Sequence, residues 1–297
     1  MTVILPEDYH ARSALEDRRV ECISREAALR QDIRPLRIGI LNIMPRADTY
    51  EFNLLFPLGR SILQIIPVWL RLESHAYHST DKAHLDKLYI SFQQAIEQQP
   101  LDGLILTGAP VEKHEFEQVT YWDEIQEIAA YAWEHVPSTL GLCWGGLALA
   151  RWLGMEKVRF DEKLFGVFET RRLVRDHPIA GDLDDIFWCP QSRYCGIPDD
   201  VLERERDAGR LNLLAASEPT GYTIFETVDH RLLMHLGHPE YNSGRLIAEL
   251  ERDRAQGLTD VPAPTNFDPD HPVNRWRSHR NEFFNAWIKY VYLTTEY

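Results

Sequence analysis

The sequence contains few cysteines and no long apolar run. Its 297 residues include 4 cysteines, and no two of them stand in a C-x-x-C arrangement. Secreted domains that depend on disulfides have a denser and more regular set. No apolar stretch approaches the roughly 18 residues of a membrane span. The first residues, MTVILPEDYH, fit neither a signal peptide nor a transit sequence. We therefore expect a cytoplasmic protein without a membrane partner.

Positive charge is also scarce. The 32 Lys and Arg residues are outnumbered by 46 Asp and Glu residues, which gives a net charge of −14. Because an acidic surface repels phosphate backbones, we predict no nucleic-acid partner. Hydrophobic residues make up 44% of the chain, which is enough for a large core and excludes a disordered or fibrous protein.

The first half of the chain alternates buried strands with helices. Apolar runs at 37–44, 65–74, 101–106 and 138–142 are typical of strands that are covered on both faces. The segments between them have helical patterns, at 51–63, 81–99 and 121–135. This rhythm predicts an α/β fold with a doubly wound, mostly parallel sheet.

The second half is less regular, and we expect it to add C-terminal strands and helices to that sheet. Short strand-like pieces, expected to be antiparallel, lie at 164–173, 186–189, 211–216, 222–227 and 232–235. Two helical segments follow them, at 243–253 and 277–292. Residues 1–34 are polar and are predicted to form an N-terminal arm with a short helix at 24–30. No linker interrupts residues 35–297, so these are predicted to form a single domain.

The strongest local signal is the run Gly141-Leu142-Cys143-Trp144-Gly145, which lies between an apolar strand and an apolar helix. It matches the nucleophile elbow with Cys in place of Ser. A strand-to-helix turn this tight needs glycines on both sides and strains the nucleophile. The helix N-terminus is expected to lower the thiol pKa, and the backbone N–H of Trp144 is a candidate oxyanion-hole donor.

A thiol nucleophile needs a base, and the base needs an acid that orients it. Of the 12 histidines, His238 stands out because it is followed by Pro239 and Glu240. Residues i and i+2 of an extended turn project to the same side, so Glu240 can accept a hydrogen bond from His238. The candidate triad is Cys143, His238 and Glu240. No recognisable metal-ligand spacing occurs among the histidines, and no metal is predicted.

A cysteine elbow followed by His-Pro-Glu on such a chain resembles the class I glutamine amidotransferase fold, which is flavodoxin-like. Further segments resemble one branch of that group, the homoserine O-acyltransferases or homoserine transsuccinylases of methionine biosynthesis. These segments are LNIMP (41–45), DGLILTGAPVE (102–112), EFEQVTYWDEI (115–125), EKLFGVFE (162–169), SRY (192–194), GHPEY (237–241), E-x-x-R-D (249–253) and WRSHRN (276–281).

The resemblance implies a ping-pong acyltransferase that uses an acyl-CoA co-substrate and no bound cofactor. Cys143 would carry the acyl group as a thioester, and His238 would deprotonate first the thiol and then the hydroxyl of the acceptor amino acid. The family's substrate-binding positions match Lys163, Ser192, Glu249 and Arg252. From spacing alone, a solvated i,i+3 ion pair between Glu249 and Arg252 would be the favoured interpretation.

The identity of the acyl donor depends on Glu112. In the family, Glu at this position goes with acetyl donors and Gly with succinyl donors, so the resemblance favours acetyl-CoA over succinyl-CoA. A carboxylate here would occupy the space of the longer chain and repel its terminal charge. The family also implies a homodimer and a local basic pocket for the phosphates of coenzyme A.

Two segments depart from the family pattern, MPRADTYE and CWGGL, and both lie where the acceptor would approach the thiol. L-homoserine is the expected acceptor, and L-serine is the alternative, since one methylene changes binding by only about 1–3 kcal/mol. A glutamine-hydrolysing amidotransferase is the second alternative. A catalytically silent relative is disfavoured because all three triad positions are filled.

Overall fold

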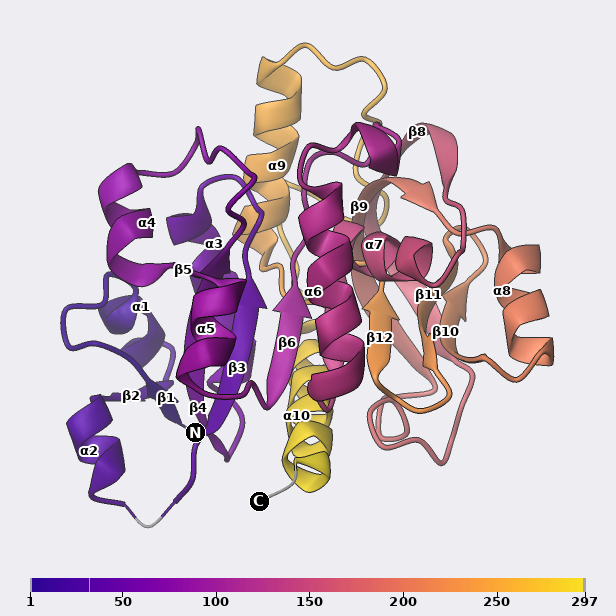
Figure 1. Ribbon diagram of the computed structural model, residues 1–297. Coiled ribbons are helices and arrows are strands. Elements are labelled where there is room, and N and C mark those ends of the chain that lie inside the picture. Colours follow the sequence, from indigo (N-terminus) through magenta and orange to yellow (C-terminus); the bar gives the residue numbers. More distant parts are fainter. Residues whose placement is uncertain (1, 32, 296–297) are drawn as a thin grey trace.

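Strands from most of the chain join in one twelve-stranded sheet (Figure 1), as seen in a computed structural model that describes residues 2–31 and 33–295. The strands follow the order β2, β1, β4, β3, β6, β7, β12, β11, β10, β8, β9, and β5 pairs with β4. Their bounds are β1 Thr2–Ile4, β2 Glu21–Ile23, β3 Leu36–Leu41, β4 Gln64–Arg71, β5 Ile90–Ser91, β6 Gly103–Leu106, β7 Thr139–Leu142, β8 Val158–Arg172, β9 Ile186–Gly196, β10 Leu211–Ser217, β11 Gly221–Thr227 and β12 Leu232–His235.

The parallel half of the sheet has the doubly wound order. Numbered along the chain, β3, β4, β6, β7 and β12 stand in the order 2-1-3-4-5, which is the flavodoxin-like arrangement. The predicted α/β class is therefore confirmed. The expectation that 232–235 would be antiparallel holds on one side only: the strand runs antiparallel to β11 but parallel to β7, with Met234 opposite Gly141.

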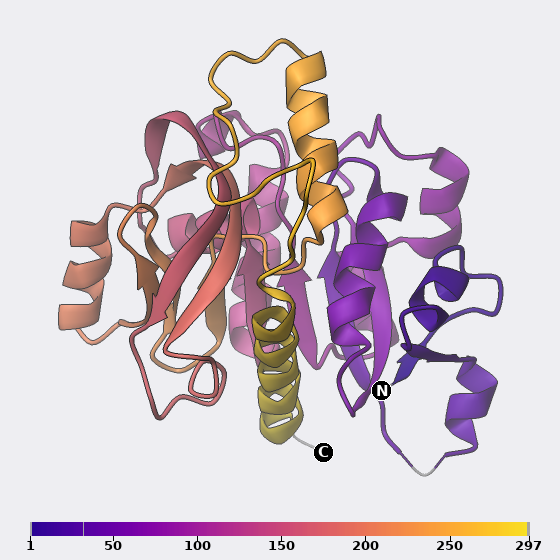
Figure 2. The same ribbon diagram turned by 180° about the vertical axis from the view of Figure 1, so that it is seen from behind.

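Helices cover both faces of the sheet (Figures 1 and 2). On one face α3 and α10 pack on Ile38 and Ile40; on the other, α5, α6 and α7 pack on Leu104 and Leu106. No helix among the described residues is long and apolar enough to cross a membrane. The helices are α1 Arg12–Glu16, α2 Arg25–Leu29, α3 Ala47–Leu58, α4 Lys82–Leu88, α5 Phe92–Gln98, α6 Trp122–His135, α7 Trp144–Trp152, α8 Asp199–Asp207, α9 Ser243–Ala255 and α10 Arg277–Thr294, with a 3₁₀ turn at Phe116–Gln118.

The helix predicted at 81–99 is in fact two helices separated by the short strand β5. Ile90 pairs with Leu70 of β4. Ser91 then starts α5 with a capping box, in which its side chain accepts from the backbone N–H of Gln94 and the Gln94 side chain accepts from the Ser91 N–H. Such a reciprocal cap starts a new helix more favourably than it continues an old one.

The N-terminal segment contributes two strands to the edge of the sheet, which the polar composition did not predict. Thr2 pairs with Gln64 of β4, and Val3 pairs with Cys22 of β2. Strands of three residues are too short to show an alternating pattern. The division of the chain at residue 34 stays a prediction.

The antiparallel half contains two long strands, β8 and β9, where short pieces were expected. They pair over most of their length, and Phe165 lies opposite Ser192. This register places Lys163 and Ser192 close together on neighbouring strands.

Candidate active site

The candidate site lies at the carboxyl ends of four parallel strands. Met44 follows β3, Gly108 follows β6, Cys143 follows β7 and His238 follows β12. All four line a cavity of about 860 Å³. In doubly wound sheets, ligands bind at this edge, where the strand order reverses. We call this space the thiol cavity.

The predicted elbow is present. Cys143 has a φ of 50°, in the left-handed region, at the turn from β7 into α7. A Cβ atom on Gly145 would lie 2.3 Å from the carbonyl oxygen of Leu106, and one on Gly141 would lie 2.6 Å from the carbonyl oxygen of Gly145. Both glycines are therefore required by the close approach of the backbone.

The three candidate triad residues come together. Cys143 and His238 line the same cavity and interact electrostatically, and the Nδ1 of His238 lies 2.7 Å from Glu240 Oε1. Tyr50 donates its hydroxyl to the same Oε1 at 2.7 Å, and the Tyr241 ring stacks on His238 at 4.0 Å. Tyr241 ends the GHPEY segment, but Tyr50 reaches the triad from α3 and gave no sequence signal.

The electrostatics of the Cys143–His238 pair differ from the expectation. Burial raises the pKa of the Cys143 thiol, and the charge of His238 opposes this shift only in part. Burial also opposes protonation of His238, but the charges of Cys143 and Glu240 hold its pKa well above the ordinary value. The prediction of a lowered thiol pKa is therefore wrong, because burial of the thiol is the largest cause of the shift.

Glu112 lies beside the thiol and not on the surface. The residue is 8% exposed, and its Oε2 lies 4.0 Å from the sulfur of Cys143. Its Oε1 accepts the backbone N–H of Tyr194 at 3.2 Å. Burial raises the pKa of Glu112 to about 7, so this carboxyl changes charge near neutral pH.

The predicted substrate-binding residues form one buried cluster. Oε1 of Glu249 accepts from Ser192 at 2.8 Å, Lys163 at 3.2 Å and Arg252 at 3.1 Å. Lys163 also contacts Asp253 at 2.7 Å. Burial opposes ionisation of Glu249, but Lys163 and other nearby cations lower its pKa to about 2. A solvated ion pair is excluded, because Glu249 is buried.

Gly108 is a part of the site that sequence reasoning missed. A Cβ atom there would lie 3.4 Å from Cε1 of His238 and 3.5 Å from Cβ of Cys143. The backbone of the loop after β6 therefore approaches the thiol closely. Trp144 starts α7 directly after the thiol and has a buried side chain; its role as an oxyanion donor stays a prediction.

Two other groups of side chains have the composition of a metal site. They are His10, Glu51 and His84, and His177, Glu226 and His230. In the second group the Nδ1 of His177 accepts from two backbone N–H groups at 3.1 and 3.0 Å. Its Nε2 therefore carries the proton and donates to Glu226, which describes a hydrogen-bonded network and disfavours a metal ligand.

The fold is that of the class I glutamine amidotransferases. Two solved structures share the fold. A glutamine amidotransferase from Thermotoga maritima has a TM-score of 0.57 at 13% identity, covering 87% of this chain and 99% of that one. A putative GMP synthase component from Thermoplasma acidophilum has a TM-score of 0.53 at 17% identity, covering 89% and 99%.

The family is narrower than the fold. The model of the homoserine O-succinyltransferase family matches residues 2–297. A homoserine O-acetyltransferase from Petrotoga mobilis is 40% identical over all of this chain and 97% of its own length. One from Bacillus subtilis is 36% identical over all of this chain and 99% of its own. The chain belongs to the homoserine O-succinyltransferase family and is an acyltransferase, which confirms the resemblance.

Proposed function

We propose that this protein transfers an acetyl group from acetyl-CoA to the side-chain hydroxyl of L-homoserine through a thioester on Cys143. The observation that carries the proposal is the thiol cavity itself. Its buried thiol interacts electrostatically with His238, and it shares the cavity with Glu249, whose Oε2 has no hydrogen-bond partner among the described residues.

In the first half-reaction, His238 takes the proton of Cys143 as the sulfur attacks the carbonyl carbon of the acyl-CoA. The carbon–sulfur bond to coenzyme A breaks, and the leaving thiolate takes the proton back from His238. Glu240 and Tyr50 keep the imidazole oriented. We assign the backbone N–H of Trp144 as the donor that stabilises the carbonyl oxygen while this oxygen carries negative charge.

In the second half-reaction, His238 takes the proton of the homoserine hydroxyl. That oxygen attacks the thioester carbonyl, the bond to Cys143 breaks, and the thiolate recovers the proton. We assign the acceptor ammonium to the unpartnered oxygen of Glu249 and the acceptor carboxylate to Arg252, which is partly exposed. Lys163 and Ser192 hold Glu249 in place.

The donor assignment rests on Glu112. With its carboxylate 4.0 Å from the sulfur, Glu112 takes up space that a succinyl chain on the thioester would need, whereas the shorter acetyl group needs less of it. Two carboxylates in a poorly solvated space repel each other. This favours acetyl-CoA as the donor.

We further propose that the enzyme works in the cytoplasm as a homodimer. All four cysteines are free, as a reducing compartment would keep them. Light scattering of the purified protein tests the dimer, and cell fractionation tests the location. A monomer at working concentration, or activity in a membrane or secreted fraction, would contradict these assignments.

The acyl transfer is tested by incubating the protein with acetyl-CoA or succinyl-CoA and following free coenzyme A together with intact protein mass. We expect a mass gain of one acetyl group that is absent in Cys143→Ala and is discharged by homoserine. Discharge by serine but not by homoserine would move the acceptor to serine. Ammonia release from glutamine without coenzyme A release would contradict the proposal.

A further inference from the structure

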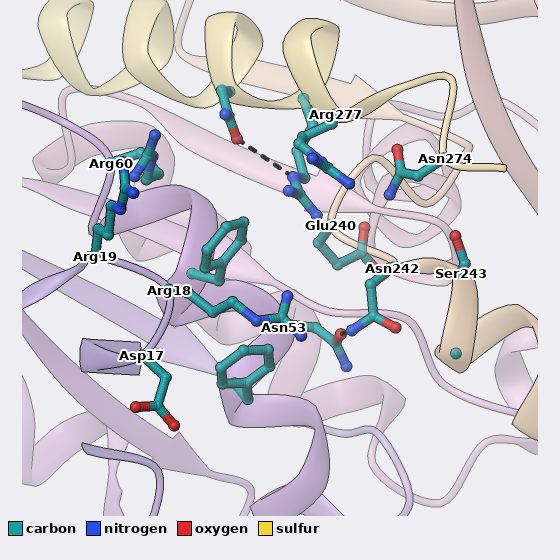
Figure 3. A pocket seen from close by; sticks show the side chains of 15 residues that line it. Asp17, Arg18, Arg19, Asn53, Arg60, Glu240, Asn242, Ser243, Asn274 and Arg277 are labelled. Carbon is teal, nitrogen blue, oxygen red and sulfur yellow. Dashed lines mark hydrogen bonds between the residues drawn. The ribbon is translucent and has the colours of Figure 1, made fainter. Parts of the chain in front are cut away.

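A second cavity, of about 550 Å³, lies behind the triad. It is lined by residues from the end of α1, by α3 and by the first turns of α9 and α10, and Glu240 forms part of its wall (Figure 3). No lining residue is shared with the thiol cavity. We call it the rear cavity.

Five arginines line the rear cavity, although the protein as a whole is acidic. They are Arg18, Arg19, Arg60, Arg277 and Arg280. Within the described ranges, no carboxylate lies within ion-pair distance of any of the five. Figure 3 shows Arg18 and Arg60 approaching from one side and Arg277 from another. Such a concentration of unpaired cations is electrostatically unfavourable without a counter-charge.

Arg280 contributes most to this excess of positive charge, because it is buried. It is 3% exposed, and burial together with the like charge of Arg277 lowers its pKa to about 10. Its guanidinium packs on the ring of Phe56 at 4.7 Å, and Nε is 3.4 Å from the side-chain oxygen of Asn281. The described residues offer no other side-chain acceptor, so most of its N–H groups are available to a ligand in the cavity.

The neutral groups around the cavity also suit an anion. Ser243 and Gly244 are the first residues of α9, a helix of 13 residues, so its positive end faces the space. Side-chain amides of Asn242 and Asn274 line the same wall. The acids present are Asp17 and Glu240; Oε1 of Glu240 is bound by His238 and Tyr50, and its Oε2 has no hydrogen-bond partner among the described residues.

We propose that the rear cavity is a binding site for a small phosphorylated metabolite that carries at least two negative charges. Guanidinium groups bind phosphate oxygens in a bidentate manner, and five of them exceed what one singly charged group can neutralise. The volume lies in the range of small-molecule sites. The ligand is distinct from the acyl donor, because His238, Glu240 and Tyr50 separate this cavity from the thiol of Cys143.

The proposal is tested by calorimetric titration of the full chain with inorganic tripolyphosphate, pyrophosphate and orthophosphate at constant ionic strength. No acyl donor or acceptor is present, so the result does not depend on the proposed reaction. We expect one saturable site per chain, with affinity falling in that order. Arg60→Gln and Arg277→Gln should each weaken tripolyphosphate binding about tenfold.

Arg204→Gln is the matched control, because it removes the same charge from an exposed position on α8. We expect it to bind tripolyphosphate as the wild type does. Circular dichroism checks that each variant is folded. As a second measurement, tripolyphosphate should raise the melting temperature of the wild type and of Arg204→Gln more than that of Arg277→Gln.

Three results would overturn the proposal. They are the absence of saturable binding, equal weakening by Arg204→Gln and the cavity variants, and displacement of tripolyphosphate by coenzyme A. The last result would identify the bound phosphates as those of the acyl donor.

Discussion

The thiol cavity and the rear cavity lie on opposite sides of the triad, and they differ in whether their charged side chains are paired. In the thiol cavity Lys163 is held between Glu249 and Asp253, and Arg252 contacts both of these acids. In the rear cavity the described residues leave five arginines unpaired. Internally paired charges hold a fixed geometry without a ligand, whereas unpaired guanidinium groups leave their N–H donors available to an anion.

The largest effect is expected at the residue between the two cavities. His238→Asn should lower kcat about 10³-fold, because it removes the general base while it leaves the volume similar. Tripolyphosphate binding should persist, because His238 does not line the rear cavity. Steady-state kinetics and titration of the same variant check both points. Loss of anion binding would show that the cavities are one site.

Removing a cation should lower the stability of the protein in the thiol cavity but not in the rear cavity. Lys163→Met removes the more buried of the two cations that contact both Glu249 and Asp253 and leaves them only Arg252, so it should destabilise the protein by about 3 kcal/mol. Arg277→Gln relieves repulsion and should leave stability equal or higher. Urea unfolding measures both. Lys113→Met is the control for lysine loss, since solvent reaches both Lys113 and its partner Asp260 and an exposed pair contributes little to stability. A stable Lys163→Met would refute the contrast.

Glu112 differs from the ion-paired acids of the thiol cavity, because the described residues give its carboxylate a backbone hydrogen bond but no ion pair. Its pKa is raised to about 7. The group is therefore neutral below that pH and charged above it, so the wild-type preference for acetyl over succinyl donors should grow as pH rises through 7. Glu112→Gln should remove this dependence and raise relative succinyl-CoA use about tenfold. Competition assays at about pH 6, 7 and 8 measure the ratio of acetyl to succinyl transfer on both sides of the Glu112 titration. An unchanged donor ratio would remove Glu112 from the specificity argument.

The smallest effect concerns communication between the cavities. An anion in the rear cavity reduces the positive potential near Glu240 and so favours the protonated form of His238. Because His238 must be neutral to accept a proton, tripolyphosphate should lower kcat/KM on the acid side of the pH profile by less than about threefold, as solvent screens the charge. Arg277→Gln should lessen this effect. An identical profile with and without tripolyphosphate would show that the cavities are independent.

Contiguous motifs were predicted from sequence, and non-local pairings were not. The elbow around Cys143 and the turn from His238 to Glu240 are short, so their residue order already implies their geometry. The break at β5 and the strand pairing of Thr2 depend on β4, which is far away in the chain. Local patterns carry no information about such partners.

By itself, the sequence determined the doubly wound fold class, and it predicted a candidate nucleophile with its base and acid and the substrate-binding cluster that the family resemblance implied. The tertiary structure decided how these groups are charged. Burial raised the pKa of Cys143, against the effect expected of the helix N-terminus, and it also raised the pKa of Glu112. It also brought Arg18, Arg60 and Arg277 together from three separate segments. The reason is that desolvation and charge pairing depend on neighbours in space, which the order of residues does not specify.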